Sequence, residues 1–179
     1  DPNTKVLLIV SKPPAKEIRE RISERLQRCG KPVVALFLGE KPVCQDKNFY
    51  QAYTLNEAAH VAVSLLRKEA VQKSYESPEE RKMLESLERF KPEEKKSSKA
   101  YYSGGTLANE AAMLIKDALD IDLPPEDVEG YMLQLGGNVV IDLGDDAYTK
   151  GKPHPMIDPA KRIECMEKAM DDPTTGVIL

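Results

Sequence analysis

The sequence predicts an α/β protein built on parallel β-sheets. The apolar runs at residues 5–10 and 32–38 are typical of strands that are buried on both faces, and residues 138–143 are predicted to be a further strand. Amphipathic or well-capped helical segments separate these runs along the chain. A strand, a helix and a second strand in this spacing give two parallel strands with a right-handed crossover. The repeated alternation of the two kinds of element therefore favours the α/β class.

The first part of the chain reads as a βαβ unit followed by another helix. Residues 5–10 and 32–38 are its two predicted strands. Residues 39–53 are predicted to be a loop, after which Thr54 and Glu57 have the spacing of a capping box at the start of a helix. The helix between the two strands carries its apolar stripe on Ile18, Ile22, Leu26 and Cys29.

The second part continues the alternation. A charged helix is predicted to begin at Pro78, and residues 91–99 read as an exposed polar linker. A short strand then ends near Tyr101, a glycine turn follows, and Thr106 is the expected N-cap of the next helix. That helix is expected to bury Leu107, Ala111, Leu114, Ile115 and Ala118. A last helix opens at Asp158-Pro159 and carries Ile163, Met166 and Met170.

The composition narrows the classes of partner. The formal net charge of −4 and the pI near 5.4 argue against nucleic acid or an anionic membrane as the main partner. No apolar run is long enough to be a membrane span. Cys29, Cys44 and Cys165 are widely spaced, so they indicate neither a disulfide framework nor a metal site. The simplest expectation is a reduced, cytoplasmic setting without a bound metal.

The turn after the Tyr101 strand is the strongest candidate binding site. Gly104 and Gly105 allow the backbone to turn sharply and approach a ligand closely. Ser103 and Thr106 add hydroxyl groups, and the free N–H groups of a helix start favour an anion. The four residues are therefore predicted to hold the phosphate or carboxylate of a small molecule. The alternative is an ordinary strand-to-helix turn with a good cap.

Two further segments carry groups that could take part in chemistry. Asp142, Asp145 and Asp146 lie at the end of a predicted strand and just beyond it, where they could bind a metal or line a polar substrate. The alternative is a solvated loop with Asx turns, and the spacing does not match an EF-hand. His154 lies between two prolines on a stiff loop, which suits a catalytic histidine held toward a site or, alternatively, a surface loop ordered by proline. His60 is expected to face solvent on its helix.

The beginning and the end of the chain resemble each other. Residues 1–8 and 172–179 share Asp, Pro, Thr, Val and Leu in register. In both copies an Asp-Pro turn leads into an apolar run, so both are predicted to be strands of parallel sheets. If the match is a true repeat, the chain starts inside one domain and stops at the equivalent strand of the next, as a fragment of a larger protein would.

These segments also resemble a known family. The turn at residues 103–111 is similar to the one that opens the second domain of succinyl-CoA synthetase alpha subunits. Residues 142–159 resemble the long hallmark segment of FdrA-like acyl-CoA synthetases, as do the shorter segments at residues 11–15 and 30–34. The resemblance covers most of residues 1–71 and 99–179.

The resemblance implies flavodoxin-like parallel sheets of the succinyl-CoA synthetase type. Residues 1–71 are then expected to be the second half of one ligase-like domain, and residues 99–179 the first half of the next. A helical and polar linker would occupy residues 72–98. An upstream CoA-binding Rossmann domain and partner subunits are expected. No cofactor is expected within this chain, since it has no Gly-x-Gly-x-x-Gly, whereas CoA or carbamoyl phosphate would bind to the full protein.

The implied function is that of an FdrA-like acyl-CoA synthetase, which handles an acyl group with CoA or phosphate. Succinyl-CoA synthetases pass phosphate through a histidine in a Gly-His-Ala-Gly segment, but residues 39–45 contain no histidine, so that mechanism is not carried over. One alternative is carbamoyl transfer between carbamoyl phosphate and oxamate. A second is a non-catalytic structural subunit. On either enzymatic reading, this chain alone is expected to be inactive.

Overall fold

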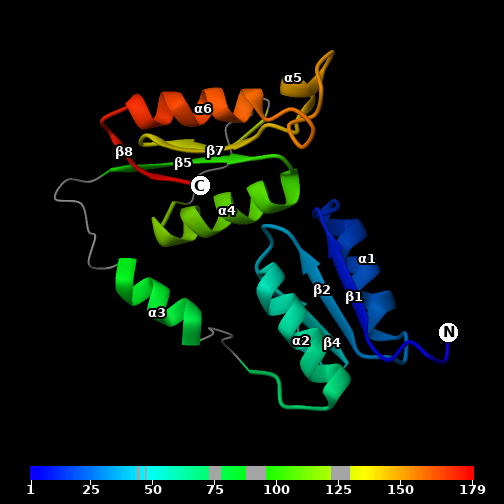
Figure 1. Ribbon diagram of the computed structural model, residues 1–179. Helices are drawn as coiled ribbons and strands as arrows, with labels where there is room; N and C mark the ends of the chain where they lie inside the picture. Colours follow the sequence, from blue (N-terminus) through cyan, green and yellow to red (C-terminus); the bar gives the residue numbers. More distant parts are fainter. Residues whose placement is uncertain (44, 47, 73–77, 88–95, 122–129) are drawn as a thin grey trace. The chain divides into compact units, whose positions relative to one another are not determined.

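The computed structural model describes the chain except residues 44, 47, 73–77, 88–95 and 122–129. The chain divides into two compact units, Asp1–Ser86 and Leu87–Leu179. Each unit contains one mostly parallel sheet with helices packed on it (Figure 1). The predicted α/β class with parallel sheets is therefore confirmed.

The sheet of the first unit has the strand order β1-β2-β4-β3. The first three strands in this order are parallel, whereas β3 runs antiparallel to β4. The helix α1 connects β1 to β2, as the predicted βαβ unit requires. The elements are β1 (Leu7–Ser11), α1 (Lys16–Gln27), β2 (Val33–Phe37), β3 (Gln45–Asp46), β4 (Phe49–Ala52) and α2 (Leu55–Arg67).

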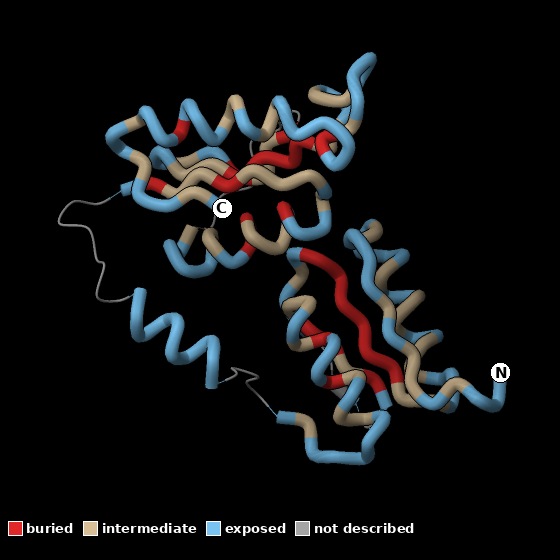
Figure 2. Tube along the Cα trace, in the orientation of Figure 1, coloured by how far each residue is buried: buried red, intermediate tan, exposed pale blue. Residues whose placement is uncertain are grey.

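The central strand β2 forms the core of this unit and is buried along its whole length (Figure 2). Val33 and Ala35 pack on the face that Ile22 and Leu26 of α1 cover. The alternate residues face α2, which explains why the sequence of β2 is apolar throughout rather than alternating. Full burial of each such Val or Leu contributes roughly 1.5–3 kcal/mol. The residues on the α2 face include Val34, Leu36, Ala58 and Val61.

The predicted loop at residues 39–53 is wrong in part. Phe49 begins β4, is fully buried, and pairs with Val33 of the parallel neighbour β2. The capping box that follows is confirmed, because Thr54 Oγ1 accepts a hydrogen bond of 3.1 Å from the backbone N–H of Glu57. The Glu57 carboxylate in turn accepts one of 2.7 Å from the N–H of Tyr53. His60 is exposed on α2, as predicted.

The predicted charged helix is confirmed as α3 (Pro78–Leu87), and none of its residues is buried. Ser77, which precedes Pro78 and is predicted from the sequence to cap this helix, lies outside the described residues.

The sheet of the second unit has the strand order β6-β7-β5-β8. The strand β5 is parallel to both of its neighbours, and β6 is antiparallel to β7. The helices α4 and α6 cover opposite faces of this sheet (Figure 1). The elements are β5 (Ser97–Tyr102), α4 (Gly105–Ala118), β6 (Tyr131–Leu135), β7 (Asn138–Asp142), α5 (Asp146–Thr149), α6 (Ala160–Asp171) and β8 (Thr175–Ile178).

The structure corrects the sequence prediction for this unit at four points. The predicted linker at residues 91–99 is too long, because β5 begins at Ser97, which is buried. The strand β6 was not expected at all. The buried face of α4 is shifted by one residue, since small side chains face the sheet while Leu107 and Leu114 are 56% and 46% exposed. The buried residues of α4 are Ala108, Ala112 and Met113. In α6 only Ala169 is buried, whereas the larger apolar residues Ile163, Met166 and Met170 are exposed.

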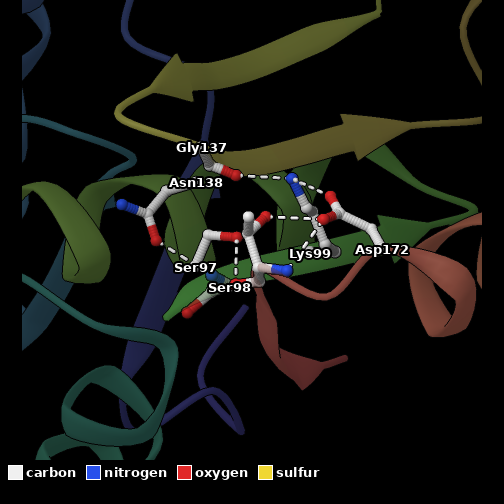
Figure 3. A network of polar contacts seen from close by, with 7 residues as sticks. Ser97, Ser98, Lys99, Gly137, Asn138 and Asp172 are labelled. Carbon is white, nitrogen blue, oxygen red and sulfur yellow. Dashed lines mark hydrogen bonds and ion pairs between the residues drawn. The ribbon is translucent and has the colours of Figure 1, made fainter. Parts of the chain in front are cut away.

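A polar network joins three segments at the N-terminal end of β5 (Figure 3). Lys99 Nζ donates a hydrogen bond of 2.7 Å to the carbonyl of Gly137 in the β6–β7 turn. The same ammonium lies 3.6 Å from Asp172 Oδ2, and the Lys99 side chain is only 13% exposed. Asn138 Oδ1 accepts a bond of 2.9 Å from the N–H of Ser98. The network therefore fixes the hairpin and the last turn of the chain to one strand.

The two Asp-Pro turns have similar local geometry. Asp1 Oδ1 accepts a hydrogen bond of 3.0 Å from the N–H of Asn3, and Asp172 Oδ1 accepts one of 2.9 Å from the N–H of Thr174. Each turn leads into a strand with a parallel neighbour, β1 beside β2 and β8 beside β5. The predicted strand at each copy of the repeat is thus confirmed.

Candidate functional site

The candidate site lies where β5 and β7 end side by side. Tyr102 is the register partner of Asp142, and the N–H of Leu143 donates a hydrogen bond of 2.7 Å to the Tyr102 carbonyl. The strand β5 is flanked by β7 and β8, and α4 and α6 lie on opposite faces. In open α/β sheets, such a reversal of winding direction leaves a crevice at the carboxyl ends of the strands. The predicted anion-binding turn at residues 103–106 is located there.

A cavity of about 440 Å³ opens at this turn. Its walls combine hydroxyl and backbone groups of the turn with aromatic and apolar side chains and one guanidinium group. Three of the four residues predicted to bind the anion, Ser103, Gly104 and Thr106, line it, and Gly105 follows Gly104 as the first residue of α4. The remaining lining residues are Tyr101, Tyr102, Leu107, Met156 and Arg162.

The helix α4 begins without a side-chain cap. Gly104 is the N-cap, so the prediction that Thr106 caps this helix is wrong. The first N–H groups of a helix lack intrahelical acceptors, and the N-cap residue, a glycine, has no side chain that could accept from them. Gly104 has φ −178° and ψ 128°, an extended conformation that any residue adopts, and a Cβ atom built on it meets nothing within 4 Å. Neither backbone strain nor packing therefore requires glycine at this position of the cavity wall.

His154 and Asp142 converge on Gly144 beside the turn. A Cβ atom on Gly144 would lie 2.9 Å from His154 Nε2, 3.0 Å from Asp142 Oδ1 and 3.3 Å from the carbonyl carbon of Ser103. Gly144 is thus the spacer that lets the imidazole approach the end of β7. His154 and Asp142, which the sequence marks as separate candidates, thus lie close together in the fold, and neither is among the residues that line the cavity.

The loop of His154 is tightly held by its own backbone. The N–H groups of Ile157 and Asp158 donate hydrogen bonds of 2.8 and 3.0 Å to the His154 carbonyl. His154 Nδ1 accepts a bond of 3.2 Å from the N–H of Met156. Because Nδ1 acts as an acceptor, the neutral imidazole carries its proton on Nε2. The nitrogen that faces Gly144 is therefore a hydrogen-bond donor.

The three aspartates have different environments. Asp142 is buried, and its Oδ1 accepts a hydrogen bond of 2.9 Å from the N–H of Gly144. Asp145 caps α5 by accepting a bond of 2.9 Å from the N–H of Ala147, and Asp146 is exposed. None of the three is among the residues that line the cavity. In the described parts of the chain, no group of three or more His, Cys, Asp or Glu side chains is placed to hold a metal ion.

Tyrosines around the site are partly withdrawn from water. Burial raises the pKa of Tyr101 and Tyr102 above the ordinary value, and the charge of Glu110 adds to the effect on Tyr102. Burial, followed by the nearby Tyr131, raises the pKa of Tyr148 to about 12. Of these tyrosines, Tyr101 and Tyr102 are among the residues that line the cavity.

Arg162 is the site residue that sequence reasoning missed. It lies in the first turn of α6, and its Nη1 donates a hydrogen bond of 3.3 Å to Ser103 Oγ. The two residues are 59 positions apart in the sequence, so no local pattern joins them. The one signal in the sequence is the position of Arg162 in a helix that directly follows the hallmark segment of His154.

Comparisons with known proteins find a family model and a relative that are similar to this chain. Residues 101–179 match the CoA-ligase family model, so the matched segment contains the turn, His154 and Arg162. The chain is also 32% identical over 187 residues to the uncharacterized protein YahF of Escherichia coli (strain K12). That alignment covers 100% of the chain and 36% of YahF, so the chain spans about a third of the length of this curated relative. Among the described helices, none has the length and apolar character to cross a membrane.

Proposed function

We propose that this chain is part of an FdrA-like acyl-CoA synthetase and that its cavity binds the phosphate or carboxylate of an acyl substrate. The observation that carries the proposal is the uncapped start of α4, which opens into the cavity at Gly104. Unpaired N–H groups and the helix dipole favour an anion at such a position. The CoA-ligase match of residues 101–179 supports acyl transfer as the class of reaction.

Each predicted site residue has a role in this proposal. The N–H groups at the start of α4, together with the hydroxyls of Ser103 and Thr106, bind the anionic oxygens. Gly104 leaves room for the ligand. His154 donates a hydrogen bond from Nε2 to negative charge that develops on the substrate, and preorganised donors of this kind are the usual source of transition-state stabilisation in acyl transfer. The proposal keeps the prediction that three aspartates near the end of β7 line the substrate, namely Asp142, Asp145 and Asp146.

The domain organisation belongs to the same proposal. Residues 1–71 are the second half of one ligase-like domain, and residues 99–179 are the first half of the next. Residues 72–98 are the linker that connects the two halves. The parallel strand orders of the two units support this assignment. CoA itself binds to an upstream Rossmann domain, and partner subunits complete the enzyme, which operates in the cytoplasm.

The test replaces Gly104 with Ala and measures the affinity of the chain for acetyl phosphate by calorimetry. The added methyl group occupies the open space at the cavity wall, so affinity is expected to fall about tenfold or more. Loss of glycine at an N-cap costs up to about 1 kcal/mol of stability. The matched control is Thr54→Ala, which removes the cap of α2 in the other unit at a similar cost and is expected to leave affinity unchanged.

The same assay separates the alternatives. Carbamoyl phosphate bound far more tightly than acetyl phosphate would favour carbamoyl transfer, which uses the same anion site. If the folded chain binds neither compound, the anion site is rejected, and the remaining alternative is a non-catalytic structural subunit.

A further inference from the structure

The guanidinium of Arg162 lies at the wall of the cavity and has no carboxylate partner among the described residues. The guanidinium of Arg162 donates to Ser103 Oγ at 3.3 Å, and within the described residues this is its one hydrogen bond. No ion pair with a described carboxylate is formed by Arg162, whereas its neighbour Lys161 pairs with Glu164 at 3.0 Å. Arg162 is half-buried and so loses part of its hydration, and no carboxylate in the described part of the chain compensates for this loss.

The bond to Ser103 also fixes what the serine can do. A guanidinium has donors only, so Ser103 Oγ must be the acceptor in this contact. The proton of the Ser103 hydroxyl is then free to be donated to another group. Both side chains line the same cavity, which therefore presents a charged donor and a neutral donor side by side.

We propose that Arg162 and Ser103 form a two-donor clamp that binds one oxyanion group of the ligand, a phosphate or a carboxylate, and that Arg162 determines the preference of the cavity for an anion. A planar guanidinium matches either group with parallel hydrogen bonds. The clamp rests on the proposed function, because it places the anion in the same cavity. It goes beyond that proposal by adding a charged residue from α6 to a site otherwise made of backbone and hydroxyl groups.

The walls around the clamp restrict the rest of the ligand. Tyr101, Leu107 and Met156 are aromatic or apolar, and Met156 is 78% exposed at the cavity. They offer no charged partner for a second polar end. The clamp therefore fits a ligand with one anionic group on a small, weakly polar body.

The test compares Arg162→Met and Arg162→Lys with the unchanged chain, using inorganic phosphate and acetate as probes. Arg162→Met keeps an unbranched stem but removes the charge, and the affinity for the bound probe is expected to fall about 10- to 100-fold. Arg162→Lys is expected to recover part of this loss, because the charge returns without the planar fork. The matched control is Lys161→Met, which removes a charge from the same helix and should leave affinity unchanged.

A double-mutant cycle checks that the two donors act on the same anion. If they do, Ser103→Ala is expected to weaken binding less in the Arg162→Met background than alone. Phosphate binding without acetate binding, or the reverse, would support the clamp and identify the anion. Unchanged affinity of Arg162→Met, with Gly104→Ala still weakened, would overturn the clamp and leave the proposed site intact. Unchanged affinity in both variants would reject both proposals, provided that thermal unfolding shows every variant to be folded.

Discussion

Gly144 shows how a single residue without a side chain can set the geometry of a site. A Cβ atom there would meet His154 Nε2 at 2.9 Å and Asp142 Oδ1 at 3.0 Å, both closer than normal contacts. We predict that Gly144→Ala displaces the imidazole and weakens acetyl phosphate binding several-fold. Calorimetry measures the affinity, and thermal unfolding checks that the second unit stays folded.

The control for this prediction is the His154→Ala background. If Gly144→Ala acts through the imidazole, it has little further effect on affinity once the imidazole is gone. An equal loss in both backgrounds would contradict the explanation and point to the backbone at the end of β7.

At the residue scale, the sequence predicts what local constraints determine. The prolines around His154 and the glycine turn at residues 103–106 are local signals, and both segments lie at the candidate site. Arg162 was unpredictable because only the crossover of α6 over the sheet brings it to Ser103. The residue type of Thr106 predicts a cap, but the chain enters the helix two residues earlier, at Gly104.

Lys99 is the residue on which several elements of the second unit depend. Its ammonium joins β5 to the β6–β7 turn and to Asp172. Lys99→Met keeps the buried stem but removes the charged hydrogen bond, and we predict a loss of about 1.5–3 kcal/mol in the free energy of unfolding. Chemical denaturation measures it. Lys150→Met, at an exposed position, should stay within about 0.5 kcal/mol of the unchanged chain.

The contact between α5 and β6 predicts a dependence on alkaline pH. The pKa of Tyr148 is raised from 10.0 to about 12, mainly by burial. The unfolded chain therefore loses this proton at lower pH than the folded chain, so stability is complete below pH 10.0 and falls as the pH rises toward about 12. Tyr148→Phe is expected to flatten this fall in unfolding experiments. An unchanged slope would assign the effect to other tyrosines.

At the element scale, the sequence predicts long elements better than short ones. The apolar run of β2 and the capping box of α2 were sufficient to identify both. The strand β4 has four residues with Gln51 among them, and it is recognisable only through its pairing with β2. For β6 a signal existed, because Gly136-Gly137 is a typical two-residue hairpin turn, and both glycines have positive φ values of 57° and 85°.

The whole molecule is expected to unfold in two steps, because each unit has its own sheet and its own core. Phe49→Ala in the first unit should cost about 3–5 kcal/mol and Leu133→Ala in the second about 2–5 kcal/mol. Each substitution is predicted to lower one calorimetric transition and to leave the other in place. A single transition that moves equally in both variants would show that the units unfold together.

The strand orders of the two sheets can be combined into the order of one larger sheet. In the flavodoxin-like order 2-1-3-4-5, β7-β5-β8 have the arrangement 2-1-3, and β1-β2-β4 have the arrangement 3-4-5. The strands β8 and β1 both follow the repeated Asp-Pro turn, so each holds the third place. A circularly permuted gene that runs from residue 97 to 179 and continues with residues 9–72 would then encode a single domain with five parallel strands. In such a chimera the edge strand of one half becomes the centre of the sheet, and one cooperative transition replaces two.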